Sequence, residues 1–148
     1  MKDLFKTNLF YKYSIKSVPR ILSNMNRNPL SSSYGCMHRD YWMYKTSDFS
    51  DAIRQFPTYA LSMIYKKNLK FFDYDKKNLL NIITASLDFT FSIQHKDGSF
   101  DEFYPNERGW VGPTAFTIFS ILETIENVKN NISKNRLKDY KKKIFLTL

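Results

Sequence analysis

Apolar residues recur every three or four positions in four separate stretches of the chain, which is the spacing of an α-helix. The first stretch begins near Asp51, where Asp48 or Ser50 supplies an N-cap. Pro57 lacks the backbone N–H that a helix interior needs, so we expect a kink or a later helix start there. The apolar positions of this stretch are Ile53, Phe56, Ala60, Leu61, Ile64 and Tyr65.

The second stretch runs from an N-cap at Asp75 to about Lys96, and Gly98 follows where a left-handed residue often ends a helix. Its helically spaced positions are Leu79, Leu80, Ile83, Leu87, Thr90, Phe91 and Gln94. The third helix is expected to begin with Thr114 as its cap, and the fourth near Ser133. Their apolar sets, which we expect in the core, are Phe116, Phe119, Ile121, Leu122 and Ile125, then Leu137, Tyr140, Ile144 and Phe145.

No stretch alternates apolar and polar residues as a half-buried strand does. The 4 Gly and 5 Pro in 148 residues are also too few for a turn-rich β fold. We therefore predict an all-α fold of helical hairpins in a single domain. Residues 1–30 form a basic N-terminal arm, residues 31–127 the central hairpins with aromatic loops, and residues 128–148 a basic C-terminal helix.

The net charge of +9 comes from the two ends of the chain. Residues 1–30 carry six basic residues against one acidic residue, and residues 128–148 carry seven against one, whereas residues 31–127 hold ten against twelve. This distribution argues against a DNA-binding surface, which interleaves basic and aromatic residues. No apolar run is long enough to span a membrane, and no signal-peptide pattern occurs, so we expect a cytoplasmic protein.

Several kinds of cofactor site are excluded. The single cysteine, Cys36, permits neither an internal disulfide framework nor a cysteine-built zinc site, and we expect it to be a small buried residue. His38 and His95 are far apart in sequence, which argues against a metal site. No glycine-rich phosphate loop is present. The sequence thus predicts no metal and no cofactor.

Two segments, residues 34–49 and 94–110, concentrate aromatic rings, carboxylates and arginine, and they hold both tryptophans. Flat rings stack on the apolar faces of sugars while carboxylates accept from hydroxyls, so these segments suit carbohydrate recognition. The substrate-binding candidates are Arg39, Asp40, Trp42, Lys45, Arg108 and Trp110. The catalytic candidates are Asp97, Asp101, Glu102, Tyr104 and Glu107.

Residues 94–100, Gln-His-Lys-Asp-Gly-Ser-Phe, are similar to the repeat of terpenoid cyclase and prenyltransferase α/α toroids. The resemblance implies that Gln94 bonds the end of a neighbouring helix and that Phe100 packs where the repeat has Trp. The Asp-x-Asp-Asp acid of squalene-type cyclases is missing, and the prenyltransferase zinc ligands are not recognisable. The repeat therefore implies a fold and no terpenoid chemistry.

A longer stretch resembles uncharacterised bacterial α/α-toroid proteins that occur beside genes for surface-polysaccharide biosynthesis. The residues that carry the resemblance are Tyr34-Gly35-Cys36, Arg39, Tyr41-Trp42, Lys45, Asp48-Phe49, Gln55, Asp97-Gly98-Ser99-Phe100 and Tyr104-Pro105-Asn106-Glu107. It implies an incomplete α/α toroid. Because a closed toroid needs more hairpins, we expect either missing C-terminal hairpins or an open arc whose apolar edge favours self-association.

The leading function is thus that of a carbohydrate-associated protein of surface-polysaccharide metabolism with a saccharide partner. Whether it is an enzyme stays open. Hydrolysis needs two carboxylates in different protonation states, and β-elimination needs a base and a cation, for which Tyr104, His38, His95, Arg39 and Arg108 are candidates. Asp97 with Gly98 is typical of a turn after a helix, which we favour over a catalytic role for Asp97. The alternatives are a non-catalytic helical interaction module and a binder of nucleic acid or membrane surfaces through the basic ends.

Overall fold

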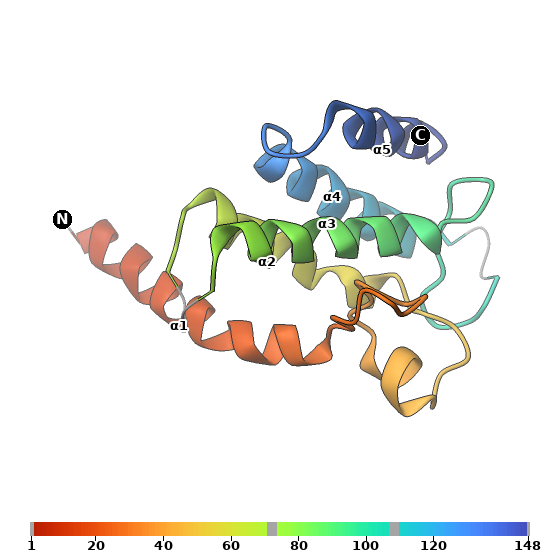
Figure 1. The fold of residues 1–148 in the computed structure, drawn as a ribbon, viewed down its shortest axis with the longest axis horizontal. Helices are drawn as coiled ribbons and strands as arrows, with labels where there is room; N and C mark the ends of the chain where they lie inside the picture. Colours follow the sequence, from red (N-terminus) through yellow and green to blue (C-terminus); the bar gives the residue numbers. More distant parts are fainter. Residues whose placement is uncertain (1, 71–73, 107–109, 148) are drawn as a thin grey trace.

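The computed structural model describes residues 2–70, 74–106 and 110–147. Within these residues the chain forms α-helices and short helical turns, and no strand, so the all-α prediction is confirmed (Figure 1). The α-helices are α1 (Lys2–Asn24), α2 (Pro57–Lys66), α3 (Lys76–Ser92), α4 (Val111–Val128) and α5 (Lys134–Phe145). A π-helical turn, η1 (Asp40–Tyr44), and a 3-10 turn, η2 (Ile53–Gln55), lie in the connection between α1 and α2.

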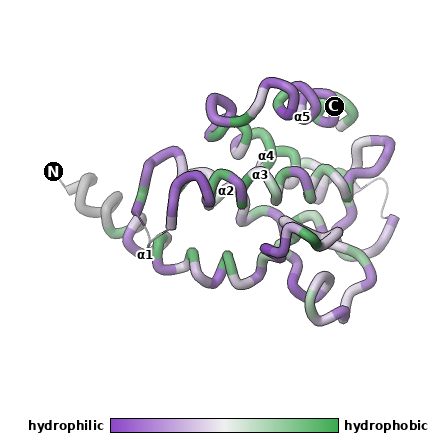
Figure 2. Tube along the Cα trace, viewed as in Figure 1, coloured by the Kyte–Doolittle hydropathy of each residue, from purple (hydrophilic) through white to green (hydrophobic). Residues whose placement is uncertain are grey.

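Helix α2 packs against both α3 and α4, and this trio holds the centre of the core. Its fully buried side chains include Leu61 of α2, Ile83 and Leu87 of α3, and Val128 of α4. Helix α1 and helix α5 lie on opposite sides of the trio (Figure 1). Helix α4 is largely apolar along its length, whereas α5 is largely hydrophilic (Figure 2). The two basic ends of the chain are therefore separated rather than gathered on one surface.

Helix boundaries differ from the sequence prediction at three points. Helix α2 begins at Pro57, which is the later start that the missing N–H favours, and η2 precedes it. Helix α3 ends at Ser92, four residues before the predicted Lys96, because the residues that follow turn to contact α5. Helix α4 begins three residues before Thr114, whose hydroxyl accepts from the N–H of Phe100 instead (3.1 Å).

The segment from Gln94 to Phe100 holds the end of α5. The Gln94 Nε2 lies 3.0 Å from the carbonyl oxygen of Lys143 and 2.9 Å from the Thr147 hydroxyl. Helix ends leave carbonyls unpaired, so a neighbouring amide donor stabilises them. Phe100 is fully buried. Both residues thus do what the toroid resemblance implies, while the toroid itself stays a prediction.

The predicted core face of α4 is partly wrong. Ile121 and Ile125 are buried, but Phe116, Phe119 and Leu122 are 63%, 49% and 44% exposed. Apolar residues surround this helix, so its periodicity alone does not show which side faces α2. On α5, Tyr140 and Ile144 are buried as predicted, whereas Phe145 is 75% exposed.

No helix within the described residues has both the length and the apolar character needed to cross a membrane.

The contact at α5 predicts the effect of changing Gly98. This residue has a φ of +86°, and a Cβ at this position would collide with the carbonyl of Leu146. We expect Gly98→Ala to lower the free energy of unfolding by about 2 kcal/mol or more, measured by urea denaturation. Gly112→Ala is the matched control because its nearest neighbour is the half-exposed Trp110 ring, which can turn aside. Equal stability of the two variants would contradict this account of α5.

Candidate functional site

The two polar aromatic segments of the sequence meet on one side of the molecule. The N–H of Ala52 donates to the carbonyl of Asp101 at 2.9 Å, which joins the backbones of the two connections. Beside this bond lies a cleft of about 860 Å³, called here the main cleft, which is within the size range of small-molecule sites. Its lining residues are Ile21, Asn24, Met37, His38, Arg39, Asp40, Tyr44, Asp51, Ile53, Arg54, Phe56, Pro57, Ala60, Glu102 and Phe103.

The turn η1 forms one rim of the main cleft. Lys45, with a φ of +57°, ends the turn, and its N–H donates to the carbonyl of Asp40. The Trp42 Nε1–H donates to the carbonyl of Asn24 at 2.7 Å, so this tryptophan fixes the turn to the end of α1. The Arg39 guanidinium lies 5.0 Å from the centre of the Tyr44 ring, a cation–π distance. Trp42 and Lys45 therefore shape the rim, while Arg39 and Asp40 line the cleft itself.

Gln55 fixes the opposite wall. Its Oε1 accepts from the N–H of Met37 (2.9 Å), and its Nε2 donates to the Ser50 hydroxyl and the Asp51 carbonyl. The Gln55 side chain is only 2% exposed, so these bonds form away from water. Cys36 lies beside the same hydroxyl and is fully buried, as predicted. Burial raises the pKa of the Cys36 thiol, which makes it a poor nucleophile.

His38 presents a donor to the main cleft. Its Nδ1 accepts from the N–H of Asp51 at 3.1 Å, so the neutral ring carries its proton on Nε2. That nitrogen lies 3.8 Å from Oδ2 of Asp40. Burial lowers the pKa of His38 and keeps the ring neutral. In this tautomer Nε2–H donates a hydrogen bond, and neither nitrogen is available as the base of an elimination.

Asp51 is held by local backbone. Its Oδ1 accepts from the N–H of Ile53 at 2.8 Å, and its Oδ2 lies 3.7 Å from Nε of Arg54. Burial raises the pKa of the Asp51 carboxyl. Neither Asp51 nor Arg54 was among the sequence candidates, because both fell within the helix expected to begin near Asp51. The start of α2 at Pro57 instead leaves both side chains on the wall of the cleft.

Two catalytic candidates have structural contacts elsewhere. The Asp97 Oδ1 accepts from the N–H and the hydroxyl of Ser99, which closes the turn after α3. Asp97 lines a separate pocket of about 190 Å³ with Thr147. The Asp101 Oδ1 lies 2.8 Å from Nε2 of His95, and its Oδ2 accepts from the N–H of Asn106. Neither carboxylate lines the main cleft.

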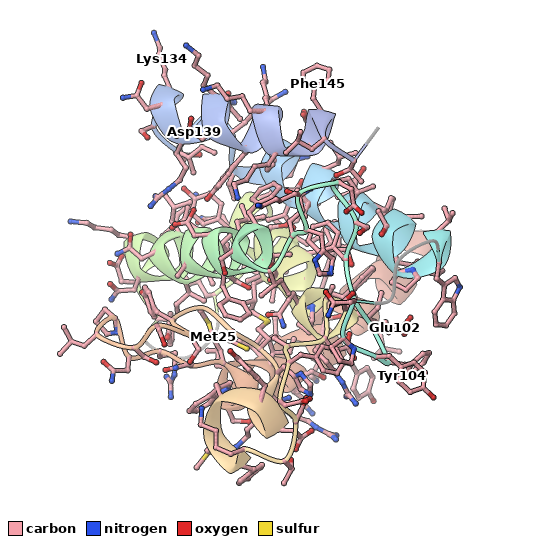
Figure 3. The ribbon with its side chains drawn as sticks, turned by 90° about the vertical axis from the view of Figure 1, so that its right-hand side faces the viewer. Met25, Glu102, Tyr104, Lys134, Asp139 and Phe145 are labelled. Atoms are coloured by element: carbon pink, nitrogen blue, oxygen red, sulfur yellow. The ribbon has the colours of Figure 1, made fainter. Side chains whose placement is uncertain are left out.

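The other candidates of the second segment differ in whether they line the main cleft. Glu102 lines it, whereas Tyr104 is 69% exposed and projects from the surface (Figure 3). Trp110 stacks on Phe103, with ring centres 5.4 Å apart and planes at 30°. Trp110 lines a neighbouring apolar groove of about 610 Å³. Glu107 and Arg108 lie outside the described residues.

The main cleft thus brings together Arg39, Asp40 and Glu102 from the two sequence-predicted segments, and it adds His38, Asp51 and Arg54. Among the described residues, no three His, Cys, Asp or Glu side chains come together as a metal site. Comparison with protein families, curated proteins and solved structures gives no match to this chain.

The Gln55 network predicts a stability effect. Gln55→Leu keeps the volume of the side chain but leaves the buried N–H of Met37 without its acceptor. We expect the variant to lose about 2–3 kcal/mol of unfolding free energy in urea denaturation. Arg54→Ala serves as the control, because the Arg54 guanidinium is mostly exposed to solvent and its pair with Asp51 contributes about 1 kcal/mol at most. A Gln55→Leu variant as stable as the control would show that the network does not hold the wall.

His38 predicts a dependence of stability on pH. Its pKa in the folded chain lies below the ordinary value of 6.5, so the unfolded chain binds more protons as the pH falls through this range. The free energy of unfolding should therefore decrease between pH 7.5 and pH 5.5. The raised pKa of Asp51 acts in the opposite direction, but nearer the ordinary aspartate value of 3.8.

Urea midpoints at the two pH values measure this decrease. In His38→Asn, the amide oxygen can accept from Asp51 N–H at any pH, so we expect the decrease to be smaller. His95→Gln changes the other histidine of the chain and should retain it. An unchanged decrease in His38→Asn would remove His38 as its source.

Proposed function

We propose that this chain binds a saccharide in the main cleft, as a carbohydrate-associated cytoplasmic protein of surface-polysaccharide metabolism. The observation that carries the proposal is that the segments around Arg39 and Glu102, more than sixty residues apart in sequence, line one cleft. Each segment contributes aromatic and charged side chains. The toroid resemblance of the sequence supports the polysaccharide context.

The lining suits a ligand with many hydroxyl groups. Arg39 and the Nε2–H of His38 supply donors, and the carboxylates of Asp40 and Glu102 supply acceptors. The rings of Tyr44, Phe56 and Phe103 also line the cleft and can cover the apolar face of a sugar ring. A hydroxyl group is both donor and acceptor, so it can use both kinds of partner.

The charge of the cleft argues against a polyanion as its ligand. Two arginines, Arg39 and Arg54, face the three carboxyl groups of Asp40, Asp51 and Glu102. A phosphate backbone needs an excess of cations, and the excess of this chain lies instead in α1 and α5. Because those helices are on opposite sides of the molecule (Figure 1), they do not support one continuous nucleic-acid surface.

Binding is better supported than hydrolysis or elimination. Asp97 and Asp101 have structural contacts outside the cleft, and the His38 tautomer that the Asp51 N–H selects is not a base. The Asp51 carboxyl group accepts from the N–H of Ile53 and lies 3.7 Å from Nε of Arg54, so both of its oxygens have local structural contacts. We therefore propose recognition of the saccharide without catalysis.

A glycan array of bacterial surface oligosaccharides, followed by titration calorimetry with the glycans that bind, tests this function. Arg39→Ala and Glu102→Gln should each weaken binding about 10-fold or more, since each removes a charged hydrogen-bonding partner. Glu126→Gln makes the same chemical change as Glu102→Gln on the exposed surface of α4 and should leave affinity unchanged. No bound glycan, or equal affinity in all three variants, would refute the proposal.

A further inference from the structure

Helix α4 exposes an apolar stripe over most of its length. Its members are Val111, Phe116, Phe119 and Leu122, with exposed fractions of 73%, 63%, 49% and 44%. Phe116, Phe119 and Leu122 follow one another at steps of three residues along one side of the helix, and Val111 is exposed at its first position. The whole of α4 contains no Lys or Arg, and its two charged residues, the half-buried Glu123 and the exposed Glu126, lie near its C-terminal end.

The stripe continues onto neighbouring segments. Phe103 and Trp110 are 60% and 45% exposed, and Phe56 at the start of α2 is 36% exposed. A large apolar or aromatic side chain has an accessible area of about 150–250 Å² when fully exposed. The exposed parts of these seven residues therefore add up to roughly 700 Å². The largest apolar patch of a typical monomer is about 300–600 Å². One side of a stable protein interface buries about 800 Å², so this α4 face has the size of an interface.

The α4 face carries both a ridge and a groove. Phe119 packs edge-on against Tyr59 (6.0 Å), and Tyr59 packs edge-on against Phe56 (6.2 Å), which makes a supported aromatic ridge. Beside it lies the apolar groove of about 610 Å³. The groove is lined by Ile53, Phe56, Glu102, Phe103, Trp110, Gly112, Pro113 and Phe116.

We propose that the α4 face binds a second copy of this chain. In a two-fold dimer the same patch meets itself, so a ridge beside a groove allows each copy to insert its ridge into the groove of the other. Charge supports this occupant, because the basic excess of the chain lies on α1 and α5, away from the patch. An anionic lipid surface or a nucleic acid would need cations on the patch, and α4 supplies none.

The proposed interface can be tested separately from the saccharide proposal. Arg39 and Asp40 line the main cleft but not the groove, whereas Trp110 and Phe116 line the groove but not the main cleft. Phe56 and Phe103 form the wall between the two, and Ile53 and Glu102 also line both. Substitutions on α4 can therefore test association without touching the polar side chains of the cleft.

Sedimentation velocity of the full chain from about 1 to 200 µM tests the dimer. We expect a species of twice the 17.6 kDa chain mass to dominate at the upper end. The double variant Phe116→Glu/Phe119→Glu should weaken association about 100-fold or more, because it buries charge in the interface. Phe145→Glu is the matched control, because Phe145 of α5 is more exposed than Phe116 or Phe119 and lies outside the patch. We expect this variant to associate as the wild type does.

Three outcomes would overturn the proposal. The first is a wild-type chain that stays monomeric over the whole range, which would assign the α4 face to a different partner. The second is a polydisperse series of larger species, which would indicate unspecific aggregation. The third is a dimer that persists in the α4 double variant. Thermal melting at low concentration verifies that the double variant, whose changes are at exposed positions, is folded.

Discussion

Two side-chain amides, the buried Gln55 and the half-buried Gln94, fix the long connections of this chain against its helices. Gln55 pairs with the backbone of Met37 and Asp51, and Gln94 lies within bonding distance of the Lys143 carbonyl at the end of α5. Backbone N–H and C=O groups that lie outside helices and are shielded from water need hydrogen-bond partners. An amide side chain supplies both a donor and an acceptor. Without these amides the connections would have to be solvated, and the core could not close over them.

The position of the main cleft follows from these bonds. Gln55 sets the path of residues 36–38, while Gln94 and the fully buried Phe100 set the direction in which the chain leaves α3. The two paths converge where Ala52 donates to Asp101. The polar side chains that flank this bond therefore line one cleft, held in place by these hydrogen bonds. Pre-arranged groups of this kind lose little entropy when a ligand binds.

Much of the fold could be predicted from the sequence, because helical periodicity is a local property that a single segment displays. The ends of helices could not, since they depend on distant partners. Thr114 has the character of a cap, yet its hydroxyl serves Phe100 from inside α4. The buried side of α4 was equally hidden, because Phe116 and Ile121 are both apolar and only packing against α2 distinguishes them.

The candidate site, like the fold, could be predicted only in part from the sequence. The two segments that the sequence indicated, because rings and charges gather in them, both line the main cleft. Which carboxylates face the cleft depended on local geometry. The Asp97 carboxylate accepts from the N–H of Ser99 in the turn that precedes Phe100, a role typical of Asp-Gly-Ser. The Asp101 carboxylate lies 2.8 Å from Nε2 of His95. Asp51 and Arg54 were missed because α2 begins only at Pro57, and the chain before it, including the 3-10 turn that contains Arg54, lines the cleft.

The wall formed by Phe56 and Phe103 gives the two proposals a physical connection. Phe103 is 60% exposed and is supported on the groove side by its stack on Trp110. A second copy seated in the groove would hold Phe103 between two surfaces and remove rotamer freedom from the ring. A saccharide that stacks on the opposite side of this ring would then lose less entropy on binding, which is positive coupling without a change of fold. The same linkage requires that a bound saccharide favours the dimer.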